Sequence, residues 1–376
     1  MPLVVQVIPR LNSNGGTERG VVDIARGLKA AGWGSVVVSA GGPLVTNLER
    51  HKIQHITLPV DSKNPIIIQA NIFRLTKVIR QLNADIIHVR SRAPAWSART
   101  AAKRTNIPFL TTVQGIYNSS TMLKRRYNSI MTSGDLVITN SNFTAKHIMN
   151  VYGADPARIR IVHRGVDLSI FNPSAVTSAR MVNLAERWRL PDGVSVVMLP
   201  GRLTRWKGHE LLINAIAKID RSDICCVFVG ENTDHVSYQK TLENKINELK
   251  LNTTIRLVGG ADDMPAAYML ADVVVNTSIR PEAFGRVLAE AESMGRPVVA
   301  ADHGGAKETV ISGKTGWLFK PGDVNSLTDA LNQALNLSNE SRDILAKNSM
   351  FHIKQNFSLE KMIESTINVY KELLED

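Results

Sequence analysis

The sequence predicts an α/β protein built from two doubly wound domains in tandem. At 376 residues the chain is too long for one ordinary core, so two domains are expected. Short, nearly continuous apolar runs alternate with longer amphipathic segments, which is typical of a parallel sheet covered by helices on both faces. The alternation breaks once, at the Asp-, Asn- and Pro-containing stretch 164–175, and then starts again.

The elements follow in order along the chain. Helical spacing of Val21, Ile24 and Leu28 predicts a helix over 17–32, and a second helix is expected at 66–83. A clean amphipathic helix ends the chain at 357–376, and we expect it to pack back toward the first domain. The domains themselves are expected at 1–173 and 174–356. Strands are predicted at 3–9, 35–40, 84–89, 108–113, 135–141 and 158–162, and then at 194–202, 224–230, 253–260, 271–278 and 297–302.

Charge is distributed unevenly between the two predicted domains. Up to residue 173, 22 Lys and Arg stand against 8 Asp and Glu, a net +14; the remainder has 23 against 26, a net −3. Either the basic surface only aids solubility, or the first domain contacts something anionic, such as phospholipid, a phosphorylated glycolipid or nucleic acid. Nucleic acid is disfavoured, because aromatic residues are only 5% and no nucleic-acid-binding motif is present.

Two further features bear on the compartment. No apolar run reaches the about 18 residues of a transmembrane helix, and the N-terminal apolar run is interpreted as a strand rather than a signal peptide. Cys225 and Cys226 are adjacent on a predicted strand, so they point to opposite faces and should not pair. We therefore expect a cytoplasmic protein without structural zinc.

Candidate ligand-binding residues follow the first strand of each domain. Ligands of such sheets bind beyond the carboxyl ends of the strands. Gly15 and Gly16 would let backbone N–H groups approach a ligand, unless they only form a turn. In the second domain Arg202 and Lys207 offer a planar fork of donors and a compact charge, which suit a diphosphate. The alternative is two solvated cations on a loop.

Two acids, Glu282 and Glu290, stand eight positions apart in "RPEAFGRVLAEAESMGRPVVAADHGG". We expect Glu282 in the loop after a strand and Glu290 on a helix from about 285 to 294. Eight helical residues span about 12 Å, more than the about 5–9.5 Å between the carboxylates of glycosidases. The pair better fits a ligand whose hydroxyl groups are gripped at two points, as sugars allow. The alternative is a helix-capping Glu282 and a surface Glu290.

These motifs carry a family resemblance. "RPEAFGRVLAEA" has the Glu-x7-Glu pattern of family-4 retaining glycosyltransferases. It is accompanied, in the same order as in that family, by "GGTERGVVDIARGLKAAG", "VITNSNFTA", "RGVDLSIFNP", "PGRLTRWKG" and "DHGGAKETVISGKTGWLFKPGD". More narrowly, the chain resembles the lipopolysaccharide-core mannosyltransferases of alphaproteobacteria. The resemblance implies a GT-B fold, in which two Rossmann-like domains face each other across a cleft and the second holds a nucleotide sugar.

The resemblance also implies roles for individual residues. Glu282 would contact the hydroxyls of the donor sugar, Glu290 the nucleotide ribose, and Arg202 and Lys207 would neutralise the diphosphate. Gln114 stands where many relatives have a His that faces the donor sugar, and glutamine does not titrate. The implied donor-binding set is Gly15, Gly16, Val258, Gly259, Phe284, Gly285, Arg286, Val287 and Glu290. Because the sequence contains no Asp-x-Asp, we expect no metal and no cofactor beyond the nucleotide-sugar co-substrate.

The acceptor side is predicted in the basic first domain. The resemblance implies a hexosyltransferase. The predicted reaction transfers mannose from GDP-mannose onto a lipopolysaccharide core or another lipid-linked acceptor. Contact with this anionic glycolipid and with the inner face of the plasma membrane is expected at Arg90, Arg92, Lys124, Arg125 and Arg126, with Met122 and Leu123 beside the last three. Alternatives are an N-acetylglucosaminyltransferase that uses a UDP-sugar, a nucleotide-sugar epimerase on the same fold, and an inactive carbohydrate-binding protein.

Overall fold

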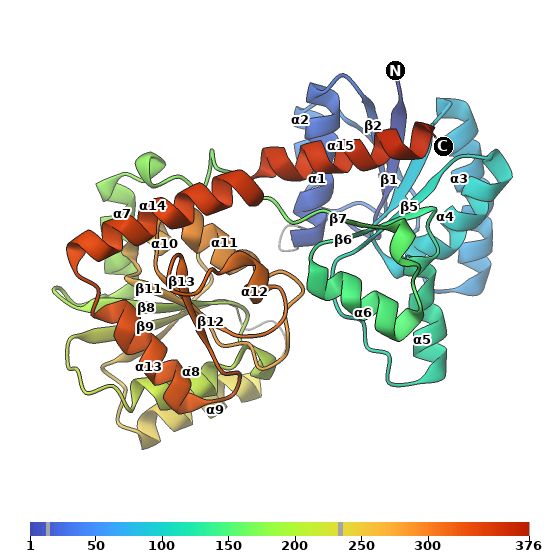
Figure 1. Cartoon of the computed structure of the whole chain (residues 1–376). Coiled ribbons are helices and arrows are strands. Elements are labelled where there is room, and N and C mark those ends of the chain that lie inside the picture. The colour runs from blue at the N-terminus through green and yellow to red at the C-terminus, as the bar shows by residue number, and fades with distance from the viewer. Residues whose placement is uncertain (13–15, 232–235, 376) are drawn as a thin grey trace. The chain divides into compact units, whose positions relative to one another are not determined.

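The computed structural model describes residues 1–12, 16–231 and 236–375. They form two compact units, each with its own parallel sheet (Figure 1). The N-terminal unit comprises Met1–Gly165 and Leu359–Asp376, and the C-terminal unit comprises Val166–Ser358. Val166 already belongs to the second unit, because its N–H donates to the Phe357 oxygen at 2.8 Å and it forms a β-bridge with Ser358. The predicted α/β fold with two Rossmann-like domains is confirmed.

The sheet of the N-terminal unit has the strand order β3-β2-β1-β4-β5-β6-β7 in the described residues, all parallel. The order reverses between β1 and β4, which is where ligands of doubly wound sheets bind. The sequence did not predict β3, an edge strand whose residues are half-buried or exposed and form no apolar run. The strands are β1 (Leu3–Val7), β2 (Gly34–Ser39), β3 (Gln54–Thr57), β4 (Ile86–Val89), β5 (Phe109–Val113), β6 (Leu136–Thr139) and β7 (Ile159–Ile161).

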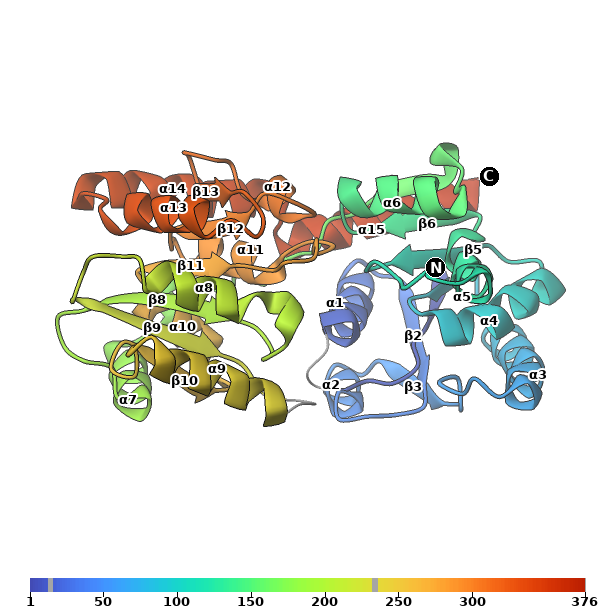
Figure 2. The same ribbon diagram turned by 90° about the horizontal axis from the view of Figure 1, so that it is seen from below.

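Helices cover both faces of this sheet. Figure 2 shows α1 and α2 on one side of the first strands and α3 and α4 on the other. The last helix, α15, packs on α1, where a Cβ at Gly27 would lie only 2.5 Å from Ile363 Cγ2. The absence of a side chain at Gly27 therefore lets the two helices meet. The helices are α1 (Gly16–Ala30), α2 (Val45–Arg50), α3 (Pro65–Leu82), α4 (Arg92–Thr105), α5 (Met122–Asn128), α6 (Asn142–Tyr152) and α15 (Leu359–Glu375).

The sheet of the C-terminal unit has the order β10-β9-β8-β11-β12-β13 in the described residues, again all parallel. Its order reverses between β8 and β11. Cys225 and Cys226 on β9 are free and buried in two different core clusters, as the alternation of side chains along a strand requires. The strands are β8 (Ser195–Pro200), β9 (Ile224–Val229), β10 (Ile255–Gly259), β11 (Val273–Asn276), β12 (Val298–Ala301) and β13 (Gly316–Phe319).

Two helical layers enclose this second sheet. Helices α8, α9 and α13 contribute to the core cluster on one face, and α7, α10 and α11 to the cluster on the other (Figure 1). Within the described ranges, no helix combines the length and the hydropathy needed to cross a membrane. The helices are α7 (Ser178–Trp188), α8 (His209–Ile216), α9 (Val236–Glu248), α10 (Met264–Leu270), α11 (Arg286–Ser293), α12 (Ala306–Thr309), α13 (Val324–Leu335) and α14 (Asn339–Asn356).

Candidate functional site

A lysine–glutamate ion pair lies beyond the carboxyl ends of β8 and β11. Lys207 Nζ is 2.8 Å from Glu282 Oε1, and the two side chains are only 12% and 16% exposed. The same ammonium lies 4.5 Å from the centre of the Trp206 ring, at the distance of a cation–π contact. Gly208, at φ +75°, ends this turn; a Cβ there would lie 2.1 Å from the Thr277 oxygen. The turn after β8 is thereby packed against the end of β11.

The carboxylate of Glu282 receives three donors on one oxygen. Lys207, Asn276 Nδ2 at 3.0 Å and the hydroxyl of Ser278 all donate to Oε1. Burial raises the pKa of Glu282, but the charge and hydrogen bond of Lys207 and the two other donors outweigh it and lower the pKa below its usual value. The carboxylate is therefore ionised at neutral pH, and Oε2 takes no part in these three contacts.

Asn276 and Ser278 were not predicted from the sequence, which indicated only that Glu282 lies in the loop after a strand. The side chain of Glu282 is held by the end of β11. The signal that could have identified them is "NTS" (276–278), a run of polar residues directly after the buried apolar strand. All three of these polar residues are buried. Buried polar side chains normally have hydrogen-bond partners, so such a run indicates that these side chains hold another group.

The glycine pair after β12 holds the backbone of the Glu282 loop. The Gly305 N–H donates a hydrogen bond to the backbone carbonyl oxygen of Glu282 at 2.8 Å. A Cβ at Gly304, whose φ is +64°, would lie 2.5 Å from that oxygen, and a Cβ at Gly305 would lie 2.4 Å from Phe284 Cα. His303 Nε2 also forms a hydrogen bond of 2.7 Å with the Ser278 oxygen. "DHGG" (302–305) therefore positions Glu282 by close backbone packing.

Glu290 lies on α11 and is buried, with 5% of its surface exposed. Its Oε2 accepts a hydrogen bond from the Tyr268 hydroxyl at 2.8 Å, and its Oε1 pairs with Arg286 Nε at 2.8 Å, one helical turn away. Burial, and then the Glu290 charge, raise the pKa of Tyr268 well above its usual value, so the phenol keeps its proton and donates. The alternative of a surface Glu290 is wrong.

The start of α11 is fixed by packing and by a glycine. The Phe284 side chain is buried in a core cluster, 5.6 Å from the Phe357 ring in an edge-to-face contact. A ligand could therefore contact Phe284 only through its backbone. Gly285, at φ +85°, is the N-cap of α11, and Val287 is half-buried against the neighbouring core.

The remaining predicted residues of this unit lie at the same sheet edge. Arg202 is exposed, and in the described part of the chain its guanidinium has no hydrogen bond or ion pair, so it is not joined to Lys207 and Glu282. Val258 and Gly259 end β10, and the oxygen of Gly259 accepts from Gly230 N–H at 2.8 Å. Arg202, Val258 and Gly259 therefore lie at the carboxyl ends of the strands, without a direct contact to the ion pair of Lys207 and Glu282.

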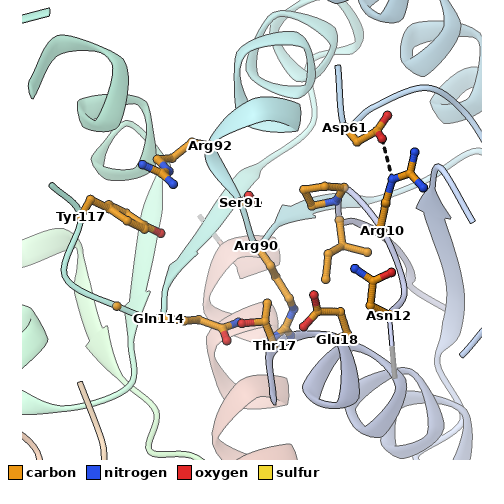
Figure 3. A pocket seen from close by; sticks show the side chains of 13 residues that line it. Arg10, Asn12, Thr17, Glu18, Asp61, Arg90, Ser91, Arg92, Gln114 and Tyr117 are labelled. Carbon is orange, nitrogen blue, oxygen red and sulfur yellow. Dashed lines mark hydrogen bonds and ion pairs between the residues drawn. The ribbon is translucent and has the colours of Figure 1, made fainter. Parts of the chain in front are cut away.

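The N-terminal unit has a pocket of about 430 Å³ beyond the carboxyl ends of β1, β4 and β5 (Figure 3). Of the predicted residues, Arg90, Arg92 and Gln114 line it, whereas Gly15 lies outside the described residues and Gly16 is the first residue of α1. The lining residues are Ile8, Pro9, Arg10, Asn12, Thr17, Glu18, Asp61, Arg90, Ser91, Arg92, Gln114, Gly115 and Tyr117.

Arg90 and Arg92 are held differently in this pocket. Arg90 is buried, and burial lowers its pKa while the Tyr370 hydroxyl of α15 counteracts this. Arg92 is half-buried; its Nη1 donates to Asn128 Oδ1 at 2.9 Å, and its guanidinium lies 4.4 Å from the centre of the Tyr117 ring. The guanidinium group of arginine offers only hydrogen-bond donors and a positive charge. The pocket therefore suits an oxygen-rich or anionic ligand.

The basic run Lys124, Arg125 and Arg126 lies on α5 rather than in this pocket. All three side chains are exposed, as are Met122 at 86% and Leu123 at 80%. Thr121 caps the helix by accepting from Lys124 N–H at 3.2 Å. A short ordered helix thus presents cations and apolar side chains together to solvent.

The residues that the structure describes contain no group of three or more His, Cys, Asp or Glu arranged to hold a metal ion.

Comparison with family models divides the chain at nearly the same place as the fold. Residues 14–170 match the model described as "Glycosyltransferase Family 4", and residues 183–350 match "Glycosyl transferases group 1".

Known structures agree with these matches. A glycosyltransferase from Rickettsia africae is 34% identical, with a TM-score of 0.93 over 100% of this chain and 99% of that one. HepE of Anabaena, solved in complex with UDP-glucose, has a TM-score of 0.84 over 99% of this chain and 100% of its own, and at 22% identity shows the fold alone.

Among curated proteins, the D-inositol 3-phosphate glycosyltransferase of Nocardioides is 30% identical over 256 residues, 64% of this chain. The match covers 54% of that protein, so this chain spans about half the length of that relative.

Proposed function

The chain belongs to the glycosyltransferases, with a family 4 domain followed by a group 1 domain on the GT-B fold, and we propose that it transfers a hexose from a nucleotide sugar with retention of configuration. The observation that carries this proposal is the buried pair of Lys207 and Glu282, beyond the carboxyl ends of the two strands where the sheet order reverses.

Glu282 suits the hydroxyl groups of a donor sugar. Its three donors converge on Oε1, so Oε2 is available to accept from a ligand. The lowered pKa keeps this carboxylate acceptor-only at neutral pH, which matches the O–H donors of a sugar. The rigid support from Asn276, Ser278 and Gly305 fixes the position of the carboxylate before the ligand arrives, which reduces the cost of ordering it.

Lys207 and Arg202 suit the diphosphate of the leaving group. Lys207 is a cation beside the reacting sugar, and Arg202 is an exposed fork of donors five residues before it on the same turn. The N-terminus of α11 adds backbone N–H groups and the positive end of a helix dipole. We propose that these groups stabilise the departing charge without a metal ion.

Glu290 suits the ribose of the nucleotide. Two of the about four lone-pair positions of its carboxylate are used by Tyr268 and Arg286, which leaves acceptor capacity for a pair of ribose hydroxyls. Val258 and Gly259, at the end of β10, would then line the base.

For the donor sugar we propose mannose carried by GDP, on the narrower sequence resemblance alone. N-acetylglucosamine carried by UDP is the competing donor. HepE was solved in complex with UDP-glucose, and the Nocardioides relative is named a D-inositol 3-phosphate glycosyltransferase, so the donor panel includes several bases and sugars.

For the acceptor we propose an anionic glycolipid of the lipopolysaccharide core at the inner face of the membrane. The pocket of the N-terminal unit contains Arg90 and Arg92, and that half of the sequence has a net charge of +14, from 22 basic and 8 acidic residues up to residue 173. The exposed Met122, Leu123 and basic run on α5 offer apolar and cationic contacts to an anionic leaflet.

The test is a thermal-shift panel with GDP-mannose, UDP-N-acetylglucosamine, UDP-glucose and the free nucleoside diphosphates GDP and UDP. Turnover assays with and without EDTA follow. A ligand that binds only the folded chain increases the free energy of unfolding, by about 2.7 kcal/mol at a concentration 100 times its Kd. This stabilisation raises Tm. We expect one nucleotide sugar to raise Tm and to be turned over in EDTA. Turnover that EDTA abolishes and Mg²⁺ or Mn²⁺ restores would contradict the metal-free proposal.

A further inference from the structure

The side chain of Gln114 is held by Arg164, a residue that the sequence did not single out as part of the site. Gln114 follows β5 and lines the pocket of the N-terminal unit. Its Oε1 accepts a hydrogen bond from Nη2 of Arg164, which lies fifty positions further along the chain. Nη1 of the same guanidinium donates to the Gly16 oxygen at 2.5 Å. Arg164 therefore connects the end of β5 with the first residue of α1.

This contact determines which end of the Gln114 amide meets the guanidinium. Arginine has five N–H donors and no acceptor, so only the amide oxygen can face it. The two ends of a glutamine amide have nearly the same size, and an unsupported amide could turn either way. Asn140 does not compete for the amide, because its Nδ2 donates to the backbone oxygen of Gln114 at 3.2 Å.

Arg164 also joins two walls of the pocket. Thr17 and Glu18, in the first turn of α1, form one wall, and Gln114 and Tyr117 form the other (Figure 3). The guanidinium lies against the backbone of α1 at Gly20, where an added Cβ would lie 3.8 Å from Nη2. A larger side chain at Gly20 would occupy the space beside the Arg164 guanidinium.

We propose that Arg164 is a positioning residue for the glycosyl transfer proposed above, because it fixes the amide of Gln114 with Oε1 inward and the Nε2 N–H group available to the pocket. The position then offers only hydrogen-bond donors to a ligand oxygen, such as a sugar hydroxyl oxygen. It neither accepts a proton nor titrates. This role rests on the proposed function, whereas the orientation of the amide does not.

The orientation is tested by thermal unfolding of the full chain in a cycle of Gln114→Glu and Arg164→Met. A carboxylate at 114 keeps an acceptor toward Arg164 and gains its charge, so we expect Gln114→Glu alone to leave Tm unchanged or higher. In the Arg164→Met background the same carboxylate has lost its partner, and we expect Gln114→Glu to lower Tm by about 3 °C or more. A change of the same sign and size in both backgrounds would overturn the proposal.

Arg160→Met is the matched control. Arg160 is another arginine of the same unit, four positions earlier, and its ion pair with Glu372 is about one-third exposed. The control should lower Tm slightly, and Gln114→Glu should have the same effect in its background as in the wild type. An altered effect would show that the coupling is not specific to Arg164.

Turnover separates positioning from a general loss of structure. With whichever nucleotide sugar is turned over, we expect Gln114→Glu to lower kcat at least tenfold at unchanged or raised Tm, because a carboxylate replaces the N–H donors. Arg164→Lys, which keeps a positive charge and N–H donors, should retain more kcat than Arg164→Met. Because neither guanidinium nor amide titrates there, the ratio of wild-type to Arg164→Met kcat/KM should stay constant between about pH 6 and pH 9.

The outcomes distinguish the two proposals. A wild type that releases no nucleoside diphosphate from any donor would contradict the proposed function, while the unfolding cycle would still decide the orientation of Gln114. Full kcat in Gln114→Glu, or a rate ratio that changes with pH, would overturn the positioning role of Arg164.

Discussion

The ammonium of Lys207 and the carboxylate of Glu282 lie 2.8 Å apart, although the two residues are seventy-five positions apart in the chain. Both side chains are largely buried and therefore little solvated by water, so each charge is stabilised mainly by the opposite charge of its partner. The ion pair couples the folding of the C-terminal unit to the chemistry proposed for it. Removal of one partner leaves the other charge buried without compensation, which costs far more than the loss of a surface ion pair.

Glu282→Ala should therefore impair both turnover and stability. We expect a loss on the order of 3 kcal/mol in the free energy of unfolding, measured by urea denaturation, because Lys207, Asn276 and Ser278 lose their shared acceptor. Glu282→Gln/Lys207→Met should recover part of this loss without recovering turnover. A single Glu282→Ala variant with near-wild-type turnover would contradict the proposed contact with the donor sugar.

The stability supplied by Glu282 should depend on pH in one direction. Its pKa in the folded chain is lower than the about 4.3 of an unfolded glutamate, so the ionised form stabilises the fold at neutral pH. This contribution is fully present above the unfolded pKa and is lost as pH falls through the folded pKa. The difference in urea midpoint between the wild type and Glu282→Gln should thus shrink below about pH 4.3. A difference that grows on acidification would show that Glu282 is not stabilised as a carboxylate.

Tyr370→Phe should destabilise the N-terminal unit. The fully buried Tyr370 hydroxyl lies 2.7 Å from His88 Nδ1, and His88 Nε2 lies 2.6 Å from Thr112 Oγ1. Burial, and then the Arg90 charge, lower the pKa of His88 well below its usual value, so the imidazole is neutral and one ring nitrogen must accept. We expect a loss of about 1–3 kcal/mol, measured by urea denaturation, because removal of the hydroxyl leaves buried polar groups unpaired.

Tyr127→Phe provides the control for this substitution. Tyr127 is half-buried and stacked on Trp96, and its hydroxyl has no hydrogen-bond partner in the ranges that the structure describes. Its removal should change the free energy of unfolding by less than about 0.5 kcal/mol. Equal losses in Tyr370→Phe and Tyr127→Phe would show that the buried network contributes nothing specific.

Charge reversal on α5 should weaken binding to anionic vesicles. Lys124→Glu/Arg125→Glu/Arg126→Glu removes three exposed cations, each worth about 1 kcal/mol near an anionic leaflet. We expect the wild type to sediment with phosphatidylglycerol-containing liposomes at low salt and to be released at about 0.5 M salt, where the Debye length is only a few ångströms. The triple variant should sediment less while its donor-induced Tm shift is unchanged.

A matched variant separates local contact from net charge. Lys250→Glu/Lys347→Glu/Lys354→Glu makes the same change in total charge at exposed positions of the C-terminal unit. It should sediment nearly as the wild type does. If the two triple variants lose binding equally, net charge rather than α5 determines the membrane contact.

The amino-acid pattern alone predicted most strands and proposed candidate residues for the site. Apolar runs located most strands. Lys207 and Glu282 were predicted as site residues because they follow buried strands, and Glu290 because it lies eight positions after Glu282 on the next helix. Local periodicity could not reveal β3, whose residues are half-exposed, nor β13, a four-residue strand with two half-buried residues. Both are edge strands of their sheets.

Only the tertiary structure decided which side chains meet. Arg164 reaches Gln114 across 50 positions, Lys207 reaches Glu282 across 75, and His88 reaches Tyr370 across 282. Helical and strand periods report only which face of an element is apolar, because they arise from the geometry of one segment. Contacts between segments depend on sheet order and helix packing, in which the neighbours in space are distant in the chain. The sequence by itself therefore identified Lys207, Glu282 and Glu290 as candidates for the site, and the fold determined which side chains each of them contacts.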